Sequence, residues 1–335
     1  MFRPKVAING FGRIGRLSFR ALTDANKVDI VAINDITDTK TLSHLLKYDS
    51  VQMHFHGEVY PEPDAIVVNG RKIRCFAIKE PSKLPWSELG VDIVLESSGK
   101  FTTRVLAMEH IHAGAKKVII SAPADKDVKT IVMGVNDSSL TNEDIIISNA
   151  SCTTNCLAPM LKVLDDHWGI ESGFISTVHA YTSDQRLHDS PHKDLRRARA
   201  ATVSIIPTST GAAKAATMVL PQLKGKLYGK AIRVPVPDGS LTDVVCRLKK
   251  QTTREEINAA FLKTAQGVFK GVVEYTDEPI VSVDIIGNRH SVVFDSLLTE
   301  VMGYDVNIVG WYDNEGGYSW RVADLIARMG ELMVG

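Results

Sequence analysis

The sequence predicts an α/β domain followed by an α+β domain whose sheet is mainly antiparallel. Its 335 residues are enough for two domains with sizeable cores. Over residues 1–150, short β-branched runs alternate with helical segments, a pattern typical of a parallel sheet covered by helices. Beyond this point, longer β-like runs predominate and few helical segments separate them. We therefore expect the domain boundary near residue 150.

In the first domain, five apolar runs are predicted to form parallel strands. Two of them, VDIVLE and KKVIIS, are almost continuously apolar, as expected of strands buried on both faces. Helices at 16–22 and 102–113 would cover the sheet, and Asn69-Gly70 between two apolar runs predicts a hairpin. The five predicted strands are residues 6–9, 30–34, 93–96, 118–121 and 145–148.

The second domain is predicted to contain long strands and to be followed by a C-terminal helix. In residues 318–334, apolar side chains recur at near-helical spacing with charged residues between them, so this helix should dock on the rest of the chain. No internal repeat or Gly/Ser-rich linker separates the two halves. The predicted strands are residues 173–181, 231–248, 280–286, 291–297 and 306–312.

Composition excludes several classes of protein. Lysine plus arginine equals aspartate plus glutamate at 39 each, so no chain-wide field attracts nucleic acid or an acidic membrane. Hydrophobic residues at 44% and charged residues at 23% exclude a disordered or collagen-like chain. Four cysteines are too few for a disulfide framework and fit a reducing compartment. Because no apolar leader or spanning stretch is found, we expect a cytoplasmic protein without nucleic-acid or membrane partners.

Three glycines directly follow the first predicted strand. Gly10, Gly12 and Gly15 form the pattern GxGxxG between that strand and a helix, where it marks a Rossmann-type dinucleotide-binding domain. Gly10 would make the turn, Gly12 would let the backbone approach a pyrophosphate, and Gly15 would let the helix pack on the sheet. Asp35 ends the second predicted strand, where its carboxylate would bind the adenosine ribose and repel a 2′-phosphate. These features predict NAD as the cofactor.

Cys152 lies in a cap or first-turn position of a predicted helix. Unpaired N–H groups at the helix start would stabilise its thiolate and lower the thiol pKa. Cys156, one turn further, fits a small buried side chain, and the pair lacks the spacing of a zinc site, so we predict no metal. His179 ends a predicted strand, and taken alone it fits a core histidine better than a catalytic base. A Cys–His pair would also fit a cysteine hydrolase, and the glycine pattern a catalytically silent NAD-binding protein.

Three segments have the composition of a site for an anionic substrate. Residues 192–199 are basic within a neutral chain, although a solvated surface loop has the same composition. Thr210 and Gly211 lie at a predicted helix start, where hydroxyl and backbone N–H groups favour an anion. Arg233 interrupts an otherwise apolar strand and needs a carboxylate or phosphate partner.

Several of these segments together resemble one family. The chain contains NGFGRIGR, SNASCTTNCLAP, TVHAYT, RRARAA, TSTGAAK and WYDNEGGYS, in that order. With these motifs it resembles the phosphorylating glyceraldehyde-3-phosphate dehydrogenases of bacteria, from residue 3 to the C-terminus. The resemblance implies an enzyme that oxidises glyceraldehyde 3-phosphate with NAD and inorganic phosphate to 1,3-bisphosphoglycerate.

The resemblance also implies roles for individual residues. Cys152 would attack the aldehyde to form a hemithioacetal and then a thioester, with His179 as base and acid. Thr182 and Arg233 would bind the phosphate of the substrate. The residues implied to bind inorganic phosphate are Ser151, Thr153, Arg197, Thr210 and Gly211. Those implied to contact NAD, besides the three glycines and Asp35, are Arg13, Ile14, Lys79, Ser121, Asn314 and Tyr318.

The same resemblance implies how the chain is organised. Residues 1–150 and a C-terminal helix at 315–335 would form the NAD-binding domain, and residues 151–314 would form the catalytic domain. Four copies of the chain would form a homotetramer. The sequence departs from the family pattern in a few places. Lys79 stands where arginine is common, and Asp238-Gly239 replaces a common Asn-Val pair, which puts packing or subunit contacts there in doubt.

Two further departures lie at Ser98, where a Thr-Gly pair is usual before Phe101, and at Ser190, where leucine is common beside Pro191. The second lies in a loop that in this family reaches the adenosine ribose of a neighbouring subunit. Because Pro191 is retained we still expect NAD, and some use of NADP stays open. Erythrose-4-phosphate dehydrogenase, which resembles this family and has a similar Cys–His pair, is the alternative activity.

Overall fold

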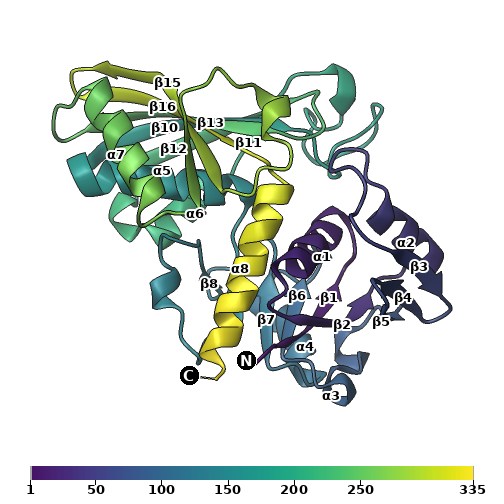
Figure 1. Ribbon diagram of the computed structural model, residues 1–335. Helices are drawn as coiled ribbons and strands as arrows, with labels where there is room; N and C mark the ends of the chain where they lie inside the picture. The colour runs from purple at the N-terminus through teal and green to yellow at the C-terminus, as the bar shows by residue number, and fades with distance from the viewer. Residues whose placement is uncertain (1, 335) are drawn as a thin grey trace. The chain divides into compact units, whose positions relative to one another are not determined.

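The computed structural model describes residues 2–334, which form two compact units. The first unit takes in the chain as far as Ile131, Asp137–Ala150 and the segment from Ser319 onward. The second takes in Val132–Asn136 and Ser151–Tyr318. Each unit is built around one sheet with helices packed against it, as labelled in Figure 1.

A sheet of nine strands, counted within the described residues, forms the first unit. Its strand order is β3-β4-β5-β2-β1-β6-β7-β9-β8. β1, β2, β6, β7 and β9 pair in parallel, so the five predicted parallel strands are confirmed. The strands are β1 Lys5–Asn9, β2 Asp29–Asn34, β3 Val59–Glu62, β4 Ala65–Val68, β5 Arg71–Phe76, β6 Ile93–Glu96, β7 Lys117–Ile120, β8 Lys129–Thr130 and β9 Ile146–Ser148.

The predicted hairpin at Asn69-Gly70 joins β4 to β5. The strands pair antiparallel with Val68 opposite Arg71, and both turn residues have positive φ, 49° for Asn69 and 76° for Gly70. Asparagine and glycine adopt this left-handed conformation more easily than other residues. The turn is therefore specified locally by its two residues.

Helices cover the sheet of the first unit. Asp38 caps α2 by accepting a hydrogen bond from the Thr41 N–H, and Thr103 caps α4 by accepting one from the Leu106 N–H. α4 lies within the predicted range 102–113 and buries Ala107 against the sheet. The helices are α1 Arg13–Ala25, α2 Thr39–Lys47, α3 Trp86–Leu89 and α4 Arg104–His112, with short 3₁₀ turns η1 Pro81–Lys83 and η2 Asp137–Ser139.

A buried polar network ties the ends of the central strands together. Glu96 of β6 accepts hydrogen bonds from Asn9 of β1 at 2.5 Å and from His110 of α4 at 3.0 Å. Trp86 Nε1 donates to His110 Nδ1 at 3.1 Å, so we assign the imidazole proton to Nε2, facing the carboxylate. Since a buried carboxylate is stable only with such partners, the network holds β1 in place just before the glycine loop.

Seven strands within the described residues form the sheet of the second unit. Their order is β11-β12-β10-β13-β16-β15-β14. Four neighbouring pairs are antiparallel, and two pairs, β10 with β12 and β14 with β15, are parallel. The strands are β10 Ile170–Ala180, β11 Ile206–Ser209, β12 Leu227–Val234, β13 Ser240–Leu248, β14 Val273–Thr276, β15 Val292–Met302 and β16 Asp305–Tyr312. The predicted α+β domain with a mainly antiparallel sheet is confirmed.

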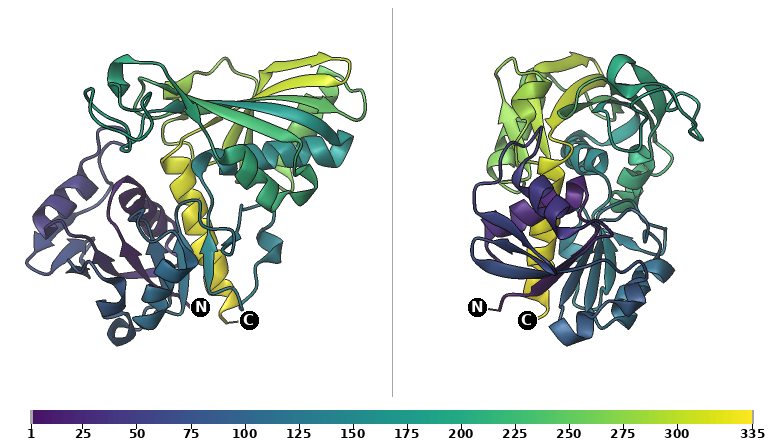
Figure 2. Two further views of the ribbon diagram at one scale, coloured as in Figure 1. Left: turned by 180° about the vertical axis from the view of Figure 1, so that it is seen from behind. Right: turned by 90° about the vertical axis from the view of Figure 1, so that its right-hand side faces the viewer.

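Three helices pack on this second sheet, and the left view of Figure 2 shows helices below the sheet. α5 Cys152–Trp168 packs on β13 and β16, α6 Ala212–Val219 on β12, and α7 Arg254–Gln266 on β14 and β15. All residues of α5 from Thr153 to Leu161 are buried, which makes its first turns part of the core. Short 3₁₀ turns occur at η3 Ala201–Val203, η4 Pro221–Leu223 and η5 Ser282–Ile285.

Two strand predictions in this unit are wrong. Residues 231–248 form two strands because the chain turns at Gly239, whose φ is 82° and where a Cβ would lie 2.1 Å from the Ser282 carbonyl oxygen. Residues 280–286 contain η5 instead of a strand. There the Asp284 carboxylate accepts a hydrogen bond from the Val281 N–H at 2.8 Å and closes a turn, although Val281 and Val283 are strand-forming residues.

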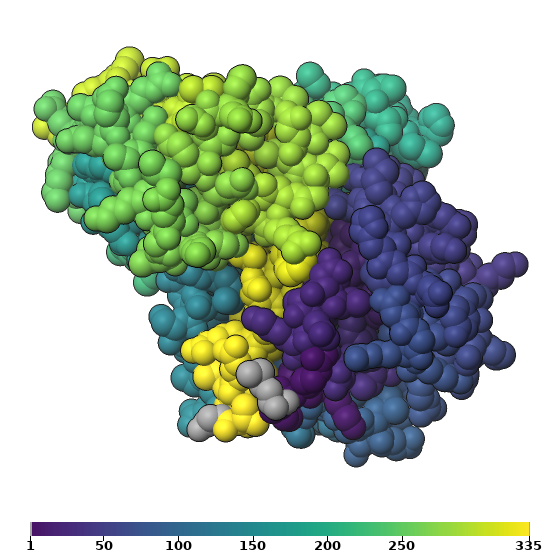
Figure 3. Space-filling view, viewed as in Figure 1, coloured from purple at the N-terminus to yellow at the C-terminus, as the bar shows by residue number. Residues whose placement is uncertain are grey.

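The predicted terminal helix is α8 Gly316–Leu332. Val322, Leu325 and Ile326 are fully buried, and a Cβ on Gly330 would lie 2.7 Å from Pro4 Cγ, so the helix packs closely on the first unit. Figure 3 shows its C-terminal part at the molecular surface. Within residues 2–334, no helix combines the length and the apolar character that crossing a membrane requires.

Candidate active site

The loop after β1 uses its three glycines in different ways. Gly10 has φ 88°, and a Cβ there would lie 2.5 Å from the Ser98 backbone. A Cβ on Gly15 would lie 2.1 Å from the Gly10 carbonyl oxygen. A Cβ on Gly12 would meet no atom within 4 Å, and its φ of −71° suits any residue. Packing therefore requires Gly10 and Gly15, whereas only a closely bound ligand would require Gly12.

The start of α1 and the end of β2 present polar groups beside this loop. α1 begins at Arg13 without a side-chain cap from Gly12, and the first N–H groups of a helix, which have no partner within it, favour an anion there. Asp35 accepts hydrogen bonds from the Phe11 N–H at 2.7 Å and from the Thr37 N–H at 3.0 Å, so its carboxylate is fixed next to the loop. Arg13 pairs with Asp49 at 2.6 Å, and Ile14 is partly buried in the first turn.

Two other predicted cofactor residues lie just after strands of the same sheet. The Asn34 side chain hydrogen-bonds the N–H and the C=O of Ile78, both at 2.9 Å, and so anchors the segment before the exposed Lys79. Ser121 Oγ, after β7, donates to the Glu96 carbonyl at 3.1 Å. Both residues follow the carboxyl ends of strands, the edge at which sheets of this type bind ligands.

Cys152 is the first residue of α5. Ser151 is the N-cap, and its Oγ accepts a hydrogen bond from the Thr154 N–H at 3.1 Å. Ala150 before it has φ 57°, a left-handed conformation that costs a non-glycine residue about 1 to 2 kcal/mol. Its N–H donates to Ser148 Oγ at 3.0 Å, which helps to hold this turn. The turn places the thiol at the positive end of a 17-residue helix.

His179, near the end of β10, faces Cys152. Its Nε2 lies 3.4 Å from Cys152 Sγ. Its Nδ1 lies 2.7 Å from the Ala180 carbonyl oxygen and 2.9 Å from Arg233 Nη1, and it cannot donate to one and accept from the other at once. Because Arg233 Nη1 also reaches the Ala180 carbonyl at 3.0 Å, we assign the proton to Nδ1, with both groups donating to that carbonyl. This tautomer turns the Nε2 lone pair toward the thiol.

Burial disfavours the charged form of both Cys152 and His179. It raises the pKa of the Cys152 thiol, against the opposing charge of Arg233 and hydrogen bonding from Thr153. Burial, and then the charge of Arg233, lower the pKa of His179 to about 3. The predicted lowering of the thiol pKa by the helix start is therefore wrong for the thiol taken alone, because desolvation outweighs it. Transfer of the thiol proton to Nε2 creates both charges together, and each then stabilises the other.

Two arginines converge on one acidic group near His179. Arg233 Nη1 donates to Thr182 Oγ1 at 3.0 Å, Thr182 donates to Asp184, and Arg197 Nη1 donates to Asp184 Oδ2 at 2.6 Å. Burial raises the pKa of Asp184, but the Thr182 hydrogen bond and the two guanidinium charges outweigh it and hold the pKa below its usual value. Arg197 Nε also lies 3.8 Å from Asp194 Oδ2, so two carboxylates face the two guanidinium groups, whose N–H donors remain suited to an anion.

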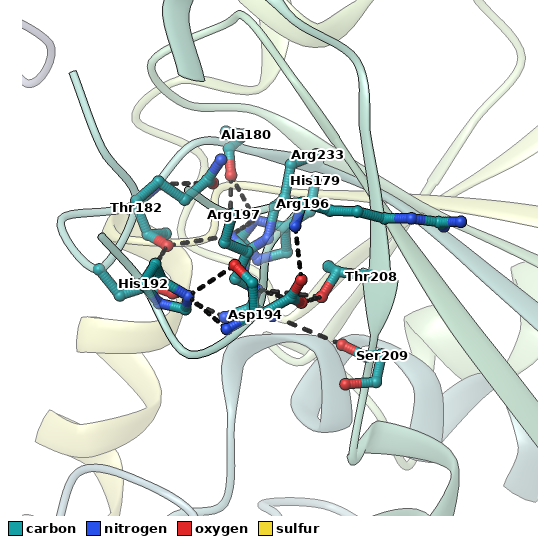
Figure 4. Close-up of polar contacts among 12 residues, drawn as sticks. His179, Ala180, Thr182, His192, Asp194, Arg196, Arg197, Thr208, Ser209 and Arg233 are labelled. Carbon is teal, nitrogen blue, oxygen red and sulfur yellow. Dashed lines mark hydrogen bonds and ion pairs between the residues drawn. The ribbon is translucent and has the colours of Figure 1, made fainter. Parts of the chain in front are cut away.

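The basic segment 192–199 contributes only part of its charge to this cluster. Arg197 Nε donates to Thr208 Oγ1 at 3.0 Å, and Nη2 lies 3.5 Å from the Ser209 carbonyl (Figure 4). Figure 4 shows Arg196 pointing away from these residues, and Arg199 pairs instead with Asp189 at 2.8 Å. The segment is thus neither a simple solvated loop nor a uniform anion site, because only Arg197 joins Arg233.

The other predicted phosphate residues lie at two helix starts. Ser151 and Thr153 begin α5, where Thr153 Oγ1 lies 2.9 Å from the Tyr312 hydroxyl. Thr210 and the exposed Gly211 precede α6, and Thr210 Oγ1 accepts a hydrogen bond from the Ala212 N–H at 3.1 Å. The two helices pack against each other, but no hydrogen bond joins these four residues directly to Arg197.

Asn314 lies two residues after β16 and Tyr318 lies in α8, and both are at most 5% exposed. Ser240 Oγ donates to Asn314 Oδ1 at 2.6 Å and accepts a hydrogen bond from the Ala180 N–H at 3.0 Å. Because Oδ1 accepts this bond, the Nδ2–H groups of Asn314 are those oriented to donate to a ligand. Ser240 thereby links Asn314 to the residue after His179.

Comparison with known proteins places both units in one family. Residues 4–104 match the model described as the NAD binding domain of glyceraldehyde 3-phosphate dehydrogenase, and residues 151–314 match that of its C-terminal domain. The chain belongs to the glyceraldehyde-3-phosphate dehydrogenase family. It is 55% identical to the glyceraldehyde-3-phosphate dehydrogenase of Mycobacterium avium, with 98% of each chain covered. It is also 55% identical to glyceraldehyde-3-phosphate dehydrogenase 2 of Streptomyces avermitilis (97% of this chain, 98% of the relative) and 54% identical to that of Bacillus subtilis (99% and 98%).

Sequence reasoning did not single out three residues of this candidate site. Tyr312 lies edge-on to His179, with ring centroids 5.9 Å apart. Asp184 orders Thr182 and Arg197, and Ser240 orders Asn314. Tyr312 and Asp184 each lie two residues from a predicted site residue, a proximity that could have identified them. Ser240 had no such signal, because only the sheet brings it next to Asn314.

Cys152 differs from the other three cysteines, all of which are also free thiols. Burial raises the pKa of Cys75 to about 11 and that of Cys246 to about 12, and Cys156 is fully buried. Of these thiols, Cys152 is the one placed beside an imidazole. No cluster of three or more His, Cys, Asp or Glu side chains able to hold a metal ion occurs in the part of the chain that the structure describes.

Proposed function

We propose that this protein catalyses the NAD-dependent oxidation and phosphorylation of glyceraldehyde 3-phosphate to 1,3-bisphosphoglycerate. One observation carries the proposal beyond family membership: the partly exposed Cys152 thiol lies 3.4 Å from Nε2 of a neutral imidazole. A nucleophile beside a base, with two arginines nearby, suits covalent catalysis on a phosphorylated aldehyde. The substitution of lysine for arginine at 79 and the other departures leave these groups intact.

The residues of the first unit fit a bound dinucleotide. A side chain on Gly12 would meet only open space, and the Asp35 carboxylate is held beside the loop, where it would repel a 2′-phosphate. We therefore assign NAD to residues 1–150 together with 315–335, and catalysis to 151–314. NAD, when bound, supplies the hydride acceptor for the oxidation. The residues that would hold it are Gly10, Gly12, Arg13, Ile14, Gly15, Asp35, Lys79, Ser121, Asn314 and Tyr318.

Cys152 would carry the covalent intermediates. As Sγ bonds to the aldehyde carbon, the thiol proton passes to His179 Nε2 and then to the new alkoxide, giving a hemithioacetal. In the oxidation, Nε2 takes the hydroxyl proton while the hydrogen on carbon leaves as hydride, and a thioester remains. Inorganic phosphate then attacks the thioester carbonyl and breaks the carbon–sulfur bond, which releases the acyl phosphate and regenerates Cys152.

Negative charge develops on the carbonyl oxygen in both additions. The Cys152 N–H is one of the first N–H groups of α5, which have no partner within the helix. We assign this N–H and the protonated Nε2 of His179 to stabilise that oxygen. The N–H groups at the start of α5 would thus stabilise mainly the transition state, because desolvation dominates the pKa of the resting thiol.

Two positive groups would hold the two phosphates. Arg233 with Thr182 would bind the phosphate of the substrate, because the guanidinium lies beside His179 and donates to the threonine hydroxyl. We assign inorganic phosphate to Arg197 and the two helix starts. That second set comprises Ser151, Thr153, Arg197, Thr210 and Gly211.

We infer that the protein works as a homotetramer in the cytoplasm. Phe174, Tyr228 and Val245 lie side by side on three neighbouring strands and are 66%, 72% and 44% exposed. An exposed apolar row of this kind is typical of a surface that another copy covers. Free thiols fit a reducing compartment.

One assay tests the proposal. We expect NADH formation from glyceraldehyde 3-phosphate that requires inorganic phosphate, with NADP at least about tenfold less effective because of Asp35. Faster, phosphate-independent oxidation of erythrose 4-phosphate would overturn the choice of substrate. Thioester hydrolysis at an equal rate without NAD would indicate a cysteine hydrolase instead.

A further inference from the structure

One buried carboxylate of the first unit contacts three other parts of the chain. Glu96 is the last residue of β6 and is 1% exposed. Its Oε2 accepts hydrogen bonds from Asn9 Nδ2 at 2.5 Å and from His110 Nε2 at 3.0 Å. Its Oε1 accepts hydrogen bonds from the backbone N–H of Ser98 at 2.8 Å and from Ser98 Oγ at 2.5 Å. Four donors therefore converge on the two oxygens of one side chain.

Asn34, Asn9 and Glu96 form a hydrogen-bonded relay across three neighbouring strands. The register of β2, β1 and β6 places these residues side by side. The Ile78 N–H donates to Asn34 Oδ1 at 2.9 Å, so the other atom of that amide, Nδ2, must be the donor. Nδ2 donates to the Ile78 carbonyl at 2.9 Å and to Asn9 Oδ1 at 2.7 Å. Asn9 Nδ2 is then the donor to Glu96, and the direction of every bond in the relay is fixed.

Only a side chain that accepts hydrogen bonds at both of its oxygens can complete this relay. The N–H groups that face Glu96 come from an asparagine amide, an imidazole and the backbone of Ser98, and none of them can reverse its direction. A glutamine at position 96 would turn its NH₂ group toward at least one of these donors in either orientation. The geometry therefore calls for a carboxylate at this position.

At one end, Glu96 holds the segment that packs against the glycine loop. A Cβ on Gly10 would lie 2.5 Å from the Ser98 backbone, so the loop and this segment are in close contact. Ser97 Oγ donates to the Gly10 carbonyl at 2.7 Å, and the Ser97 N–H donates to the Asn9 carbonyl at 2.8 Å. A shift of Ser98 would therefore move the turn at Gly10 and the backbone N–H groups that follow it.

At the other end, the relay anchors the segment that leads to Lys79. Asn34 bonds both backbone groups of Ile78, and the Asp35 N–H donates to the Phe76 carbonyl at 2.9 Å. Residues 76–78 are thus attached to the end of β2, next to the carboxylate of Asp35. The relay connects the glycine loop, Asp35 and the Lys79 segment, which are three of the parts assigned above to the cofactor.

We propose that Glu96 is a positioning residue for the cofactor site, whose carboxylate holds the glycine loop through Ser98 and the Lys79 segment through Asn9 and Asn34. The inference rests on the proposed function, in which these segments bind NAD. Because Glu96 is buried, it acts through the segments that it orders. All of its side-chain partners belong to the first unit, whereas Cys152 and His179 belong to the second. Its loss should therefore weaken NAD binding more than it slows the chemistry.

Steady-state kinetics of the full-length protein tests the proposal. Glu96→Gln keeps the size of the side chain but sets a donor against a donor, so KM for NAD should rise about tenfold. At saturating NAD, kcat and KM for glyceraldehyde 3-phosphate should stay within about twofold of the wild type. Asn34→Ala interrupts the relay at its other end and should raise KM for NAD several-fold. Val94→Ala, a fully buried apolar position on the same strand, is the matched control, and it should lower thermal stability without changing KM for NAD.

Hydrogen–deuterium exchange of the ligand-free protein, measured by mass spectrometry of its peptides, tests the positioning directly. In Glu96→Gln, exchange should become faster in residues 9–15, 76–80 and 97–101. In Asn34→Ala, the increase should be largest in residues 76–80. Val94→Ala should show no increase concentrated in these three segments.

Three results would overturn the proposal: an unchanged KM for NAD in Glu96→Gln, an equal rise in Val94→Ala, or unchanged exchange in all three segments of Glu96→Gln. If Glu96→Gln does not fold, the same two measurements on Asn34→Ala decide the inference. If the wild type neither binds nor reduces NAD, the proposed function fails. Exchange in the ligand-free variants alone then decides whether Glu96 holds these segments.

Discussion

The glycine loop and the Cys152 site are built in different ways. The loop is a run of neighbouring residues, Gly10 to Gly15, that presents backbone N–H groups, and Asp35 follows the next parallel strand. The Cys152 site takes one side chain from each of three elements, α5, β10 and β12. The register of β10 with β12 places His179 opposite Arg233. A short local sequence can specify the first kind of site, whereas the second depends on the pairing of distant strands.

This difference predicts how each site responds to substitution. In the loop, packing requires Gly10 and Gly15, whereas a closely bound ligand would require Gly12. Packing and ligand binding can therefore be altered separately. In the Cys152 site, His179 shares the Ala180 carbonyl with Arg233, and Arg233 shares Thr182 with Asp184. A change there should affect both binding and chemistry.

The largest effect is expected from removal of the nucleophile. Cys152→Ser should lower kcat by at least about 10⁴-fold, because a serine hydroxyl at this position is far less nucleophilic than the thiol. NADH formation measures the rate, and the intact mass after exposure to substrate should show no acyl adduct. Cys156→Ala, a buried thiol four residues further along, is the control and should retain most of kcat. Equal losses in both variants would contradict a special role for Cys152.

The next effect concerns the base. His179→Asn should lower kcat by about 10² to 10⁴-fold. Burial then acts on the thiol without an imidazole partner, so the thiol pKa stays raised, and alkylation of Cys152 by iodoacetate should be slow near neutral pH and recover as pH rises. Mass spectrometry of the alkylated protein measures this rate. The exposed His188→Asn serves as the control, and an unchanged alkylation profile in His179→Asn would argue against the pair.

A smaller effect should follow from exchanging one cation for another. Arg233→Lys keeps the charge but loses the planar donor that reaches both Thr182 and the Ala180 carbonyl. Loss of a charge-assisted hydrogen bond should raise KM for glyceraldehyde 3-phosphate about 10 to 100-fold. Arg247→Lys, on the exposed end of β13, should leave KM unchanged. A KM effect in Arg247→Lys as large as in Arg233→Lys would reject the assignment.

The smallest effect on stability, and the sharpest contrast, is expected within the glycine loop. Gly12→Ala should change the free energy of unfolding without ligand by only about 0.5 kcal/mol, since its Cβ meets open space. Gly15→Ala should cost about 1 to 3 kcal/mol, since its Cβ would meet the Gly10 carbonyl. Thermal unfolding with and without NAD measures both. Gly12→Ala should lose most of the stabilisation by NAD, and full NAD stabilisation in that variant would show that the dinucleotide lies elsewhere.

Much of the fold follows from local patterns in the chain. Continuous apolar runs predicted β6 and β7, and Asn69-Gly70 predicted its hairpin, because in these cases neighbouring residues determine the conformation. Two strand predictions were wrong because a single local contact redirects the backbone there. Asp284 closes η5 by bonding Val281, and Gly239 splits a predicted strand by passing close to Ser282. Neither contact is visible in an alternation of apolar residues.

The order of residues along the chain was enough to find the glycine loop, Asp35 and Cys152, because each depends on its place next to a strand or a helix start. The protonation of the site was decided only in three dimensions. Burial and the charge of Arg233 set the pKa of His179, and the sheet alone brings Arg233 beside it. Charge interactions act through space and depend on how much water remains, so strand pairing had to be known before the state of these groups could be assigned.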